Sequence, residues 1–131
     1  MSDHDIEGHF EHLKRLILAD EWRGIWDELK FQFESFGTLG VAFDASDEIV
    51  WTRCQERNVV LVTGNRNADG EESLEVVIRR LGNLTSLPVV TLADPDRVSN
   101  DRAYADRVVE RLFDYLIDIE NVRGTGRLYL P

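Results

Sequence analysis

The chain has 131 residues, of which 43% are hydrophobic and 31% charged, and its formal net charge is −10. This length and composition are typical of one globular domain covering residues 1–131, and no apolar run approaches the roughly 18 residues of a transmembrane helix. The excess of acid argues against a general nucleic-acid-coating surface, because attraction to phosphate supplies most non-specific affinity. It leaves open an enzyme that meets nucleic acid at one local arginine patch.

Helical periodicity predicts two helices in the first quarter of the chain. The first covers about residues 8–19, and its apolar face comprises Phe10, Leu13, Leu16 and Ile17. The second covers about residues 21–33, and the large apolar residues at helical spacing are Trp22, Ile25, Trp26, Leu29 and Phe33. We interpret these aromatic residues as core rather than as a ligand platform. The glycines of residues 36–41 predict a turn, with a short strand.

Residues 44–58 predict a third helix, capped by Asp44 or Ser46. Acids in its first turn, Asp47 among them, are favourable beside the positive end of the helix dipole. The residues expected to face inward are Ile49, Val50 and Cys54. Cys54 is the only cysteine, which excludes an internal disulfide and suits a reducing cytoplasm, so we expect a cytoplasmic protein with a small buried residue here.

Strands and helices alternate in the rest of the chain. The expected order is a strand at 58–63, a helix from Ser73 to Leu81, a strand at 87–93, a turn at 94–97, a helix at 100–117 and a strand at 127–131. The apolar stripe of the long helix comprises Ala105, Val109, Leu112 and Leu116. This alternation predicts an α/β sandwich with a mostly parallel central sheet, whose ligands lie outside the carboxyl ends of the strands.

The loop after the first of these strands has the polar spacing of a calcium site. Its matches to the first, third, fifth and sixth positions of an EF-hand loop are Asn65, Asn67, Asp69 and Gly70. The twelfth position requires a glutamate but is Val76, and Glu75 stands one residue early, about 100° away on a helix. A strand also enters the loop where an EF-hand has a helix. We therefore reject the EF-hand interpretation and interpret Asp69 with Glu72 as the cap of the following helix.

Ionisable side chains crowd into residues 3–12, which contain Asp3, His4, Asp5, Glu7, His9, Glu11 and His12. Two carboxylates one residue apart, Asp3 and Asp5, can share a hard divalent ion such as Mg²⁺ or Mn²⁺. The alternative is a solvated acidic terminus. His9 and His12 have a spacing that could serve zinc, but no cysteine and no histidine other than His4 supports such a site.

Three blocks follow one another along the chain: Asp3 with Asp5, Ser46-Asp47-Glu48 opening a helix, and Thr63-Gly64-Asn65-Arg66-Asn67 ending a buried strand. Their order and spacing resemble those of the PIN-like domains, metal-dependent ribonucleases that include VapC-type toxins, and in particular their short bacterial branch. The resemblance covers nearly the whole chain. It implies a three-layer sandwich in which the blocks meet at one end of the parallel sheet and hold one or two Mg²⁺ or Mn²⁺ ions.

The resemblance also assigns residue roles. The catalytic set that it implies is Asp3, Asp5, Asp47, Asn65 and Asn67. The implied metal ligands are Asp3, Asp5, Asp47 and Asp69, and the implied substrate-binding residues are Arg66 and Thr63. Single-stranded RNA is the implied substrate, and a homodimer and an antitoxin-like protein are the implied partners.

The sequence departs from the family pattern in two respects. The family's Thr-x-Asp-x-Asp block has Asn65 and Asn67 in place of its two acids, and an amide offers a metal ion a carbonyl oxygen but no charge. Only Met1 and Ser2 precede Asp3, so the family's first strand is expected to be truncated or to begin upstream. Two functions therefore remain open: a metal-dependent endoribonuclease, and a non-catalytic PIN-like module that binds a protein partner.

Overall fold

The computed structural model describes residues 1–64 and 74–131 of the chain. Its helices are η1 (His4–Ile6), α1 (Glu7–Ile17), α2 (Asp20–Leu29), α3 (Asp47–Glu56), α4 (Leu74–Leu81), α5 (Pro95–Asn100), α6 (Arg102–Ile117) and η2 (Ile119–Val122). Its strands are β1 (Val62–Thr63), β2 (Val89–Leu92) and β3 (Arg127–Leu130). None of the helices in the described ranges is long and apolar enough to cross a membrane.

The described strands form one parallel sheet in the order β1-β2-β3, so the chain has the mixed α/β architecture that the alternating pattern predicts. Val62 lies opposite Val90, which in turn lies opposite Leu128. On the other side of β1, Ser2 forms an isolated parallel bridge to Val62. Two backbone hydrogen bonds of 2.8 Å each, in which Val62 and Asp3 are the N–H donors, hold this bridge. The first residues of the chain therefore extend the sheet beyond β1.

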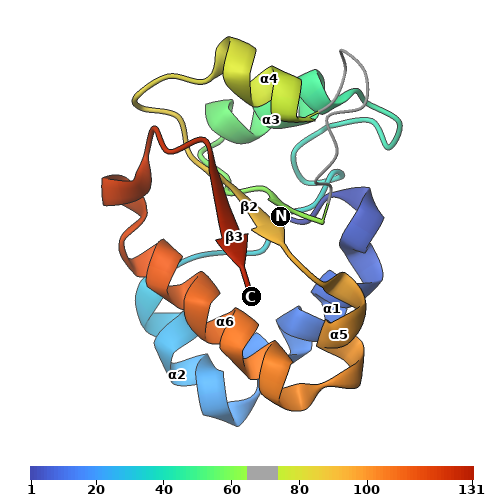
Figure 1. Ribbon diagram of the computed structural model, residues 1–131, viewed down its shortest axis with the longest axis vertical. Coiled ribbons are helices and arrows are strands. Elements are labelled where there is room, and N and C mark those ends of the chain that lie inside the picture. The colour runs from blue at the N-terminus through green and yellow to red at the C-terminus, as the bar shows by residue number, and fades with distance from the viewer. Residues whose placement is uncertain (65–73) are drawn as a thin grey trace.

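Two hydrophobic clusters lie on opposite faces of the sheet. One joins α1, α2, α5 and α6 to the strand residues Val62, Val90, Leu92 and Leu130. The other joins α3 and α4 to Leu61 and Val89. Figure 1 shows the corresponding helices above and below the strands. The alternation of neighbouring residues along β2 between the two clusters follows from the two-residue period of a strand.

The apolar faces predicted for α1 and α6 are buried, as the helical spacing requires. In α3 the predicted cap is Ser46, whose hydroxyl accepts a hydrogen bond from the Ile49 N–H at 3.4 Å. Cys54 is buried as expected, and burial raises the pKa of its thiol to about 11. The prediction that Ile49 faces inward is wrong, because its side chain is 52% exposed. The inward face of α3 is instead formed by Val50, Trp51 and Cys54.

Three predicted boundaries also change. The expected turn at 94–97 is the start of α5, because Asp94 caps the helix and Pro95 occupies its first turn, where a missing N–H costs nothing. Residues 36–41 form turns and no strand. The second helix ends at Leu29 rather than near residue 33, because Lys30 adopts a left-handed conformation with φ of 61°. The aromatic residues after it still pack against the core.

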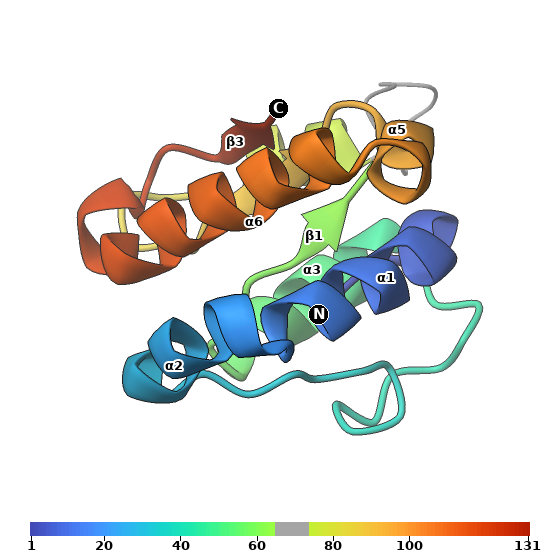
Figure 2. The ribbon, with the colours of Figure 1, turned by 90° about the horizontal axis from the view of Figure 1, so that it is seen from below.

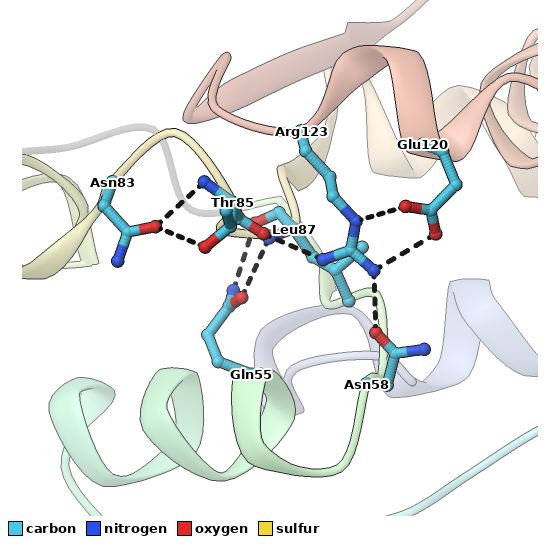
Figure 3. Close-up of polar contacts among 7 residues, drawn as sticks. All are labelled: Gln55, Asn58, Asn83, Thr85, Leu87, Glu120 and Arg123. Carbon is cyan, nitrogen blue, oxygen red and sulfur yellow. Dashed lines mark hydrogen bonds and ion pairs between the residues drawn. The ribbon is translucent and has the colours of Figure 1, made fainter.

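Gln55 of α3 and Arg123, directly after η2, bind the segment that leads into β2. The Gln55 amide donates to the Leu87 carbonyl at 3.0 Å and accepts from the Leu87 N–H at 2.8 Å, as a neighbouring strand would (Figure 3). Arg123 donates to the Thr85 carbonyl at 2.8 Å and to the Asn58 side chain at 3.0 Å, while Glu120 holds its guanidinium. These contacts join three segments that are distant in the sequence.

Candidate functional site

The candidate site lies at the carboxyl end of β1. The bridge between Ser2 and Val62 aligns the start of the chain parallel to β1, so η1 begins at the same end of the sheet at which Thr63 ends its strand. Asp3 caps η1 and accepts a hydrogen bond from the His4 N–H at 2.8 Å. Asp5 lies in the first turn of η1. The parallel pairing therefore brings both N-terminal carboxylates to the strand end.

Asp5 contacts the end of β1 directly. The backbone N–H of Gly64 and the hydroxyl of Thr63 donate hydrogen bonds to its carboxylate. Burial, and secondly the negative charge of Asp3, raise the pKa of Asp5 above its ordinary value, and these hydrogen bonds only partly offset the increase. Ionising Asp5 beside the negative charge of Asp3 therefore costs free energy. A divalent cation would relieve that cost.

Gly64 allows three segments to approach one another at this point. A Cβ at this position would lie 2.7 Å from Cγ2 of Ile6, 3.0 Å from Cγ of Pro95 and 3.4 Å from Oδ2 of Asp5. The first two distances are shorter than ordinary carbon–carbon contacts, so any larger residue would push η1 and α5 away from the strand end. The glycine is therefore a requirement of the site geometry.

An aromatic stack lies beside the two carboxylates. The His4 ring is sandwiched between Phe36 and Phe43, with ring centroids 3.8 and 3.9 Å away. Nδ1 of His4 pairs with Glu7, and Phe43, at 73% exposure, presents an aromatic surface to solvent. Exposed aromatic rings of this kind can stack on unpaired nucleic-acid bases or anchor a protein partner.

Asp47 does not join Asp3 and Asp5 in a group that could hold a metal ion. Asp47 lies in the first turn of α3, directly after the Ser46 cap. Within residues 1–64 and 74–131 no three His, Cys, Asp or Glu side chains are placed to hold a metal ion, so Asp3, Asp5 and Asp47 do not form such a group. The other residues assigned by the resemblance, Asn65, Arg66, Asn67 and Asp69, lie outside the described residues. Mg²⁺ or Mn²⁺ binding stays a prediction.

His9, one of the two histidines considered for zinc, contacts α5. Nδ1 of His9 lies 3.2 Å from the Ser99 hydroxyl, and Nε2 lies 3.3 Å from the carboxylate of Asp96. His9 therefore joins α1 to α5. The two contacts engage both of its ring nitrogens, which argues against the zinc interpretation of His9 and His12.

Sequence reasoning missed a buried arginine on the sheet. The side chain of Arg127 in β3 is only 9% exposed, and its Nε donates to Glu75 of α4 at 3.0 Å. It also donates to the hydroxyl of Thr91, which pairs with Thr63 in the sheet register. Charged and polar groups therefore cross the α4 face of an otherwise apolar sheet. The signal in the sequence was an arginine at the start of the strand predicted at 127–131.

The chain was compared with protein-family models, with curated proteins and with solved structures, and none of them matches it. Its function is therefore inferred from the site itself. That site offers two carboxylates, a threonine hydroxyl, a backbone N–H and an exposed aromatic ring at one end of a parallel sheet. These are the groups from which a metal-assisted or nucleic-acid-binding site is built.

Proposed function

We propose that this chain is a metal-dependent endoribonuclease of PIN-like type, built as a three-layer sandwich. The observation that carries the proposal is the meeting of Asp3 and Asp5 with the carboxyl end of β1. In open parallel sheets, ligands bind outside this end of the strands. The helices on both faces of the sheet support the PIN-like layering.

Asp3 and Asp5 fit a divalent ion, because they provide hard oxygen ligands whose mutual repulsion a cation would relieve. A bound Mg²⁺ or Mn²⁺ supplies Lewis-acid chemistry for phosphodiester hydrolysis. Thr63 and the Gly64 N–H hold the Asp5 carboxylate in a fixed orientation. Phe43 offers a surface on which an unpaired base stacks, which favours single-stranded RNA as substrate.

The remaining roles are carried by the resemblance. Asp47 and Asp69 would complete the metal ligands, and Asn65 and Asn67 would orient the reacting groups. Arg66 would meet a phosphate of the RNA. With amides in place of two acids, the site holds its ion less tightly than a full set of carboxylates would.

Cleavage of a fluorescent single-stranded RNA in millimolar Mn²⁺ tests the proposal. Asp5→Asn is expected to reduce the rate at least a hundredfold and to abolish the rise in melting temperature that Mn²⁺ gives the wild type. Asp27→Asn is the matched control, because Asp27 is 63% exposed on α2, and it should change neither quantity. If the wild type shows neither cleavage nor a thermal shift in Mg²⁺ or Mn²⁺, the proposal is wrong.

The second candidate is a non-catalytic PIN-like module that binds an antitoxin-like protein or a second copy of the chain. It is favoured by two exposed apolar side chains, Phe43 at 73% in the loop before α3 and Ile49 at 52% in the first turn of α3. Large side chains that are exposed in the free protein and become buried on association supply much of the binding energy of protein interfaces. Sedimentation of the wild type and of Phe43→Ser with Ile49→Ser would discriminate the two functions. An oligomer that these substitutions dissociate, without RNA cleavage, would favour the binding module.

A further inference from the structure

A cavity lies at the opposite end of β1 from Asp5, away from the candidate site. It occupies about 330 Å³ between α2, the segment 30–34, the chain that enters β1, and α6. Figure 2 shows the end of α2 and the entry to β1 at the same end of the molecule. Small-molecule pockets commonly begin near 300 Å³. The cavity is therefore large enough for a small ligand and too small for a two-chain lipid.

One wall of this cavity is apolar and partly aromatic. Trp26 stacks on Phe33 with ring centroids 4.5 Å apart, and Phe31 lies 6.3 Å from Trp26. Val60 and Leu116 contribute aliphatic surface. Such a wall offers dispersion contacts and desolvation to a hydrocarbon body, and it has few partners for a polar one.

The charged groups of the lining are mainly cationic. Lys30 and Arg57 line the cavity, against the single carboxylate of Glu34. This balance is unusual in a chain with a net charge of −10 and only two lysines. Arginine and lysine side chains both bind carboxylates through charge-assisted hydrogen bonds, so a cavity lined by one of each suits an anionic head group.

The backbone around the cavity adopts conformations that L-amino acids seldom use. Within residues 1–64 and 74–131, the non-glycine residues with positive φ are Lys30, at 61°, and Asn58, at 58°. Both line this cavity. Glycine ends a helix in this conformation at lower cost than lysine does, so Lys30 adopts its backbone conformation at the end of α2 against its own preference. Strained residues of this kind cluster at ligand sites.

We propose that this cavity binds a small amphipathic carboxylate, such as a free medium-chain fatty acid. Its hydrocarbon body lies against Trp26 and Leu116, and its carboxylate pairs with Lys30 and Arg57. The site is separate from the carboxyl end of β1, so it does not depend on the nuclease proposal. Ligand binding here would tie α2 to the entry of β1.

Titration of the full chain with decanoate, followed by tryptophan fluorescence, tests the proposal. We expect saturable binding that weakens at least tenfold in the double variant Lys30→Met, Arg57→Met. Arg15→Met, an exposed position on α1 outside the cavity lining, is the control and should bind like the wild type. Decanol has the same hydrocarbon body as decanoate but no charge. It should therefore bind the wild type more weakly than decanoate does, and the two ligands should bind the double variant equally.

Lys30→Gly separates ligand recognition from folding. It removes the cation and relieves the left-handed backbone, so decanoate binding should weaken while the urea midpoint of unfolding does not fall. Equal decanoate affinity in the wild type and the double variant would overturn the proposal, as would tighter binding of decyltrimethylammonium. The proposal would also be wrong if decanoate did not saturate the protein, or if the protein bound only anionic phospholipid vesicles. A wild-type dimer that the double substitution dissociates would likewise contradict it.

Discussion

The paired hydrogen bonds of Gln55 give the sharpest quantitative test of the fold. Gln55→Ala would leave the N–H and the carbonyl of Leu87 without their partner, and Leu87 is only 3% exposed. Each buried polar group that loses its partner costs about 1–3 kcal/mol. A glutamine side chain loses conformational entropy on folding and alanine does not, so the substitution also stabilises the folded state by roughly 1.5–2 kcal/mol. The two groups of Leu87 together cost about 2–6 kcal/mol, so we expect a net loss of about 2 kcal/mol in the free energy of unfolding.

Urea denaturation followed by circular dichroism measures this loss, and an unchanged m-value would show that the unfolding reaction is the same. Gln32→Ala is the matched control, since Gln32 is exposed and its truncation should change stability by no more than about 0.5 kcal/mol. Gln55→Glu keeps the acceptor but places a carboxylate against the Leu87 carbonyl. Its stability deficit should shrink as the pH falls and the carboxyl regains a proton to donate.

Equal stabilities of Gln55→Ala and Gln32→Ala would refute the reasoning, because the Leu87 groups would then be satisfied by water. The same conclusion would follow if Gln55→Glu lost stability equally at pH 4 and pH 7. In that case the side chain would contribute packing rather than the two hydrogen bonds.

The remaining predictions concern the strand end and the first residue. Gly64→Ala should lose about 1–3 kcal/mol in urea denaturation through overpacking, whereas Gly24→Ala, which meets nothing within 4 Å inside α2, should gain roughly 0.5–1 kcal/mol; similar losses for both would contradict the close approach. Burial and Asp3 raise the pKa of Asp5, so its charged form destabilises the folded state once the pH exceeds its ordinary value. Asp5→Asn should therefore melt no lower than the wild type at pH 7, and a clear drop would indicate a structural role instead. Burial lowers the pKa of the Met1 amino group from 8.0 to about 6. Between these pH values the unfolded chain binds this proton more strongly than the folded chain does, so stability should rise by about 2 kcal/mol from pH 6 to pH 8. A chain acetylated at the Met1 amino group should not show this rise of stability with pH. An equal rise in the acetylated chain would show that other groups cause it.

Several features of the fold could be predicted because they depend on neighbours in the sequence. The spacing of apolar residues in α1 and α6 identifies the faces that are buried, since a helix places every third and fourth residue on one side. The continuous apolar strands before residues 64 and 93 indicate a parallel sheet covered on both faces. The polar residues that follow them mark the ends of the strands.

The candidate site was predicted only in part. Asp3, Asp5 and Thr63 were expected at one end of the sheet, and they lie there. The contact of Gly64 with Ile6 and Pro95 could not be read from the sequence, because it joins three segments far apart along the chain. Arg127 was missed for the same reason, since its partner Glu75 is 52 residues away.

The sequence by itself determined which residues can share a helix face, which runs form buried strands and where polar groups follow them. Those properties arise from local periodicity and from the preferences of single residues. Only the tertiary structure decided that Ile49 faces solvent while Val50 is buried, since a run of apolar residues does not specify which one meets the sheet. It also decided that Lys30 ends α2 in a left-handed turn beside the entry to β1. The physical reason is that both outcomes depend on packing between segments distant in the sequence, which no local pattern contains.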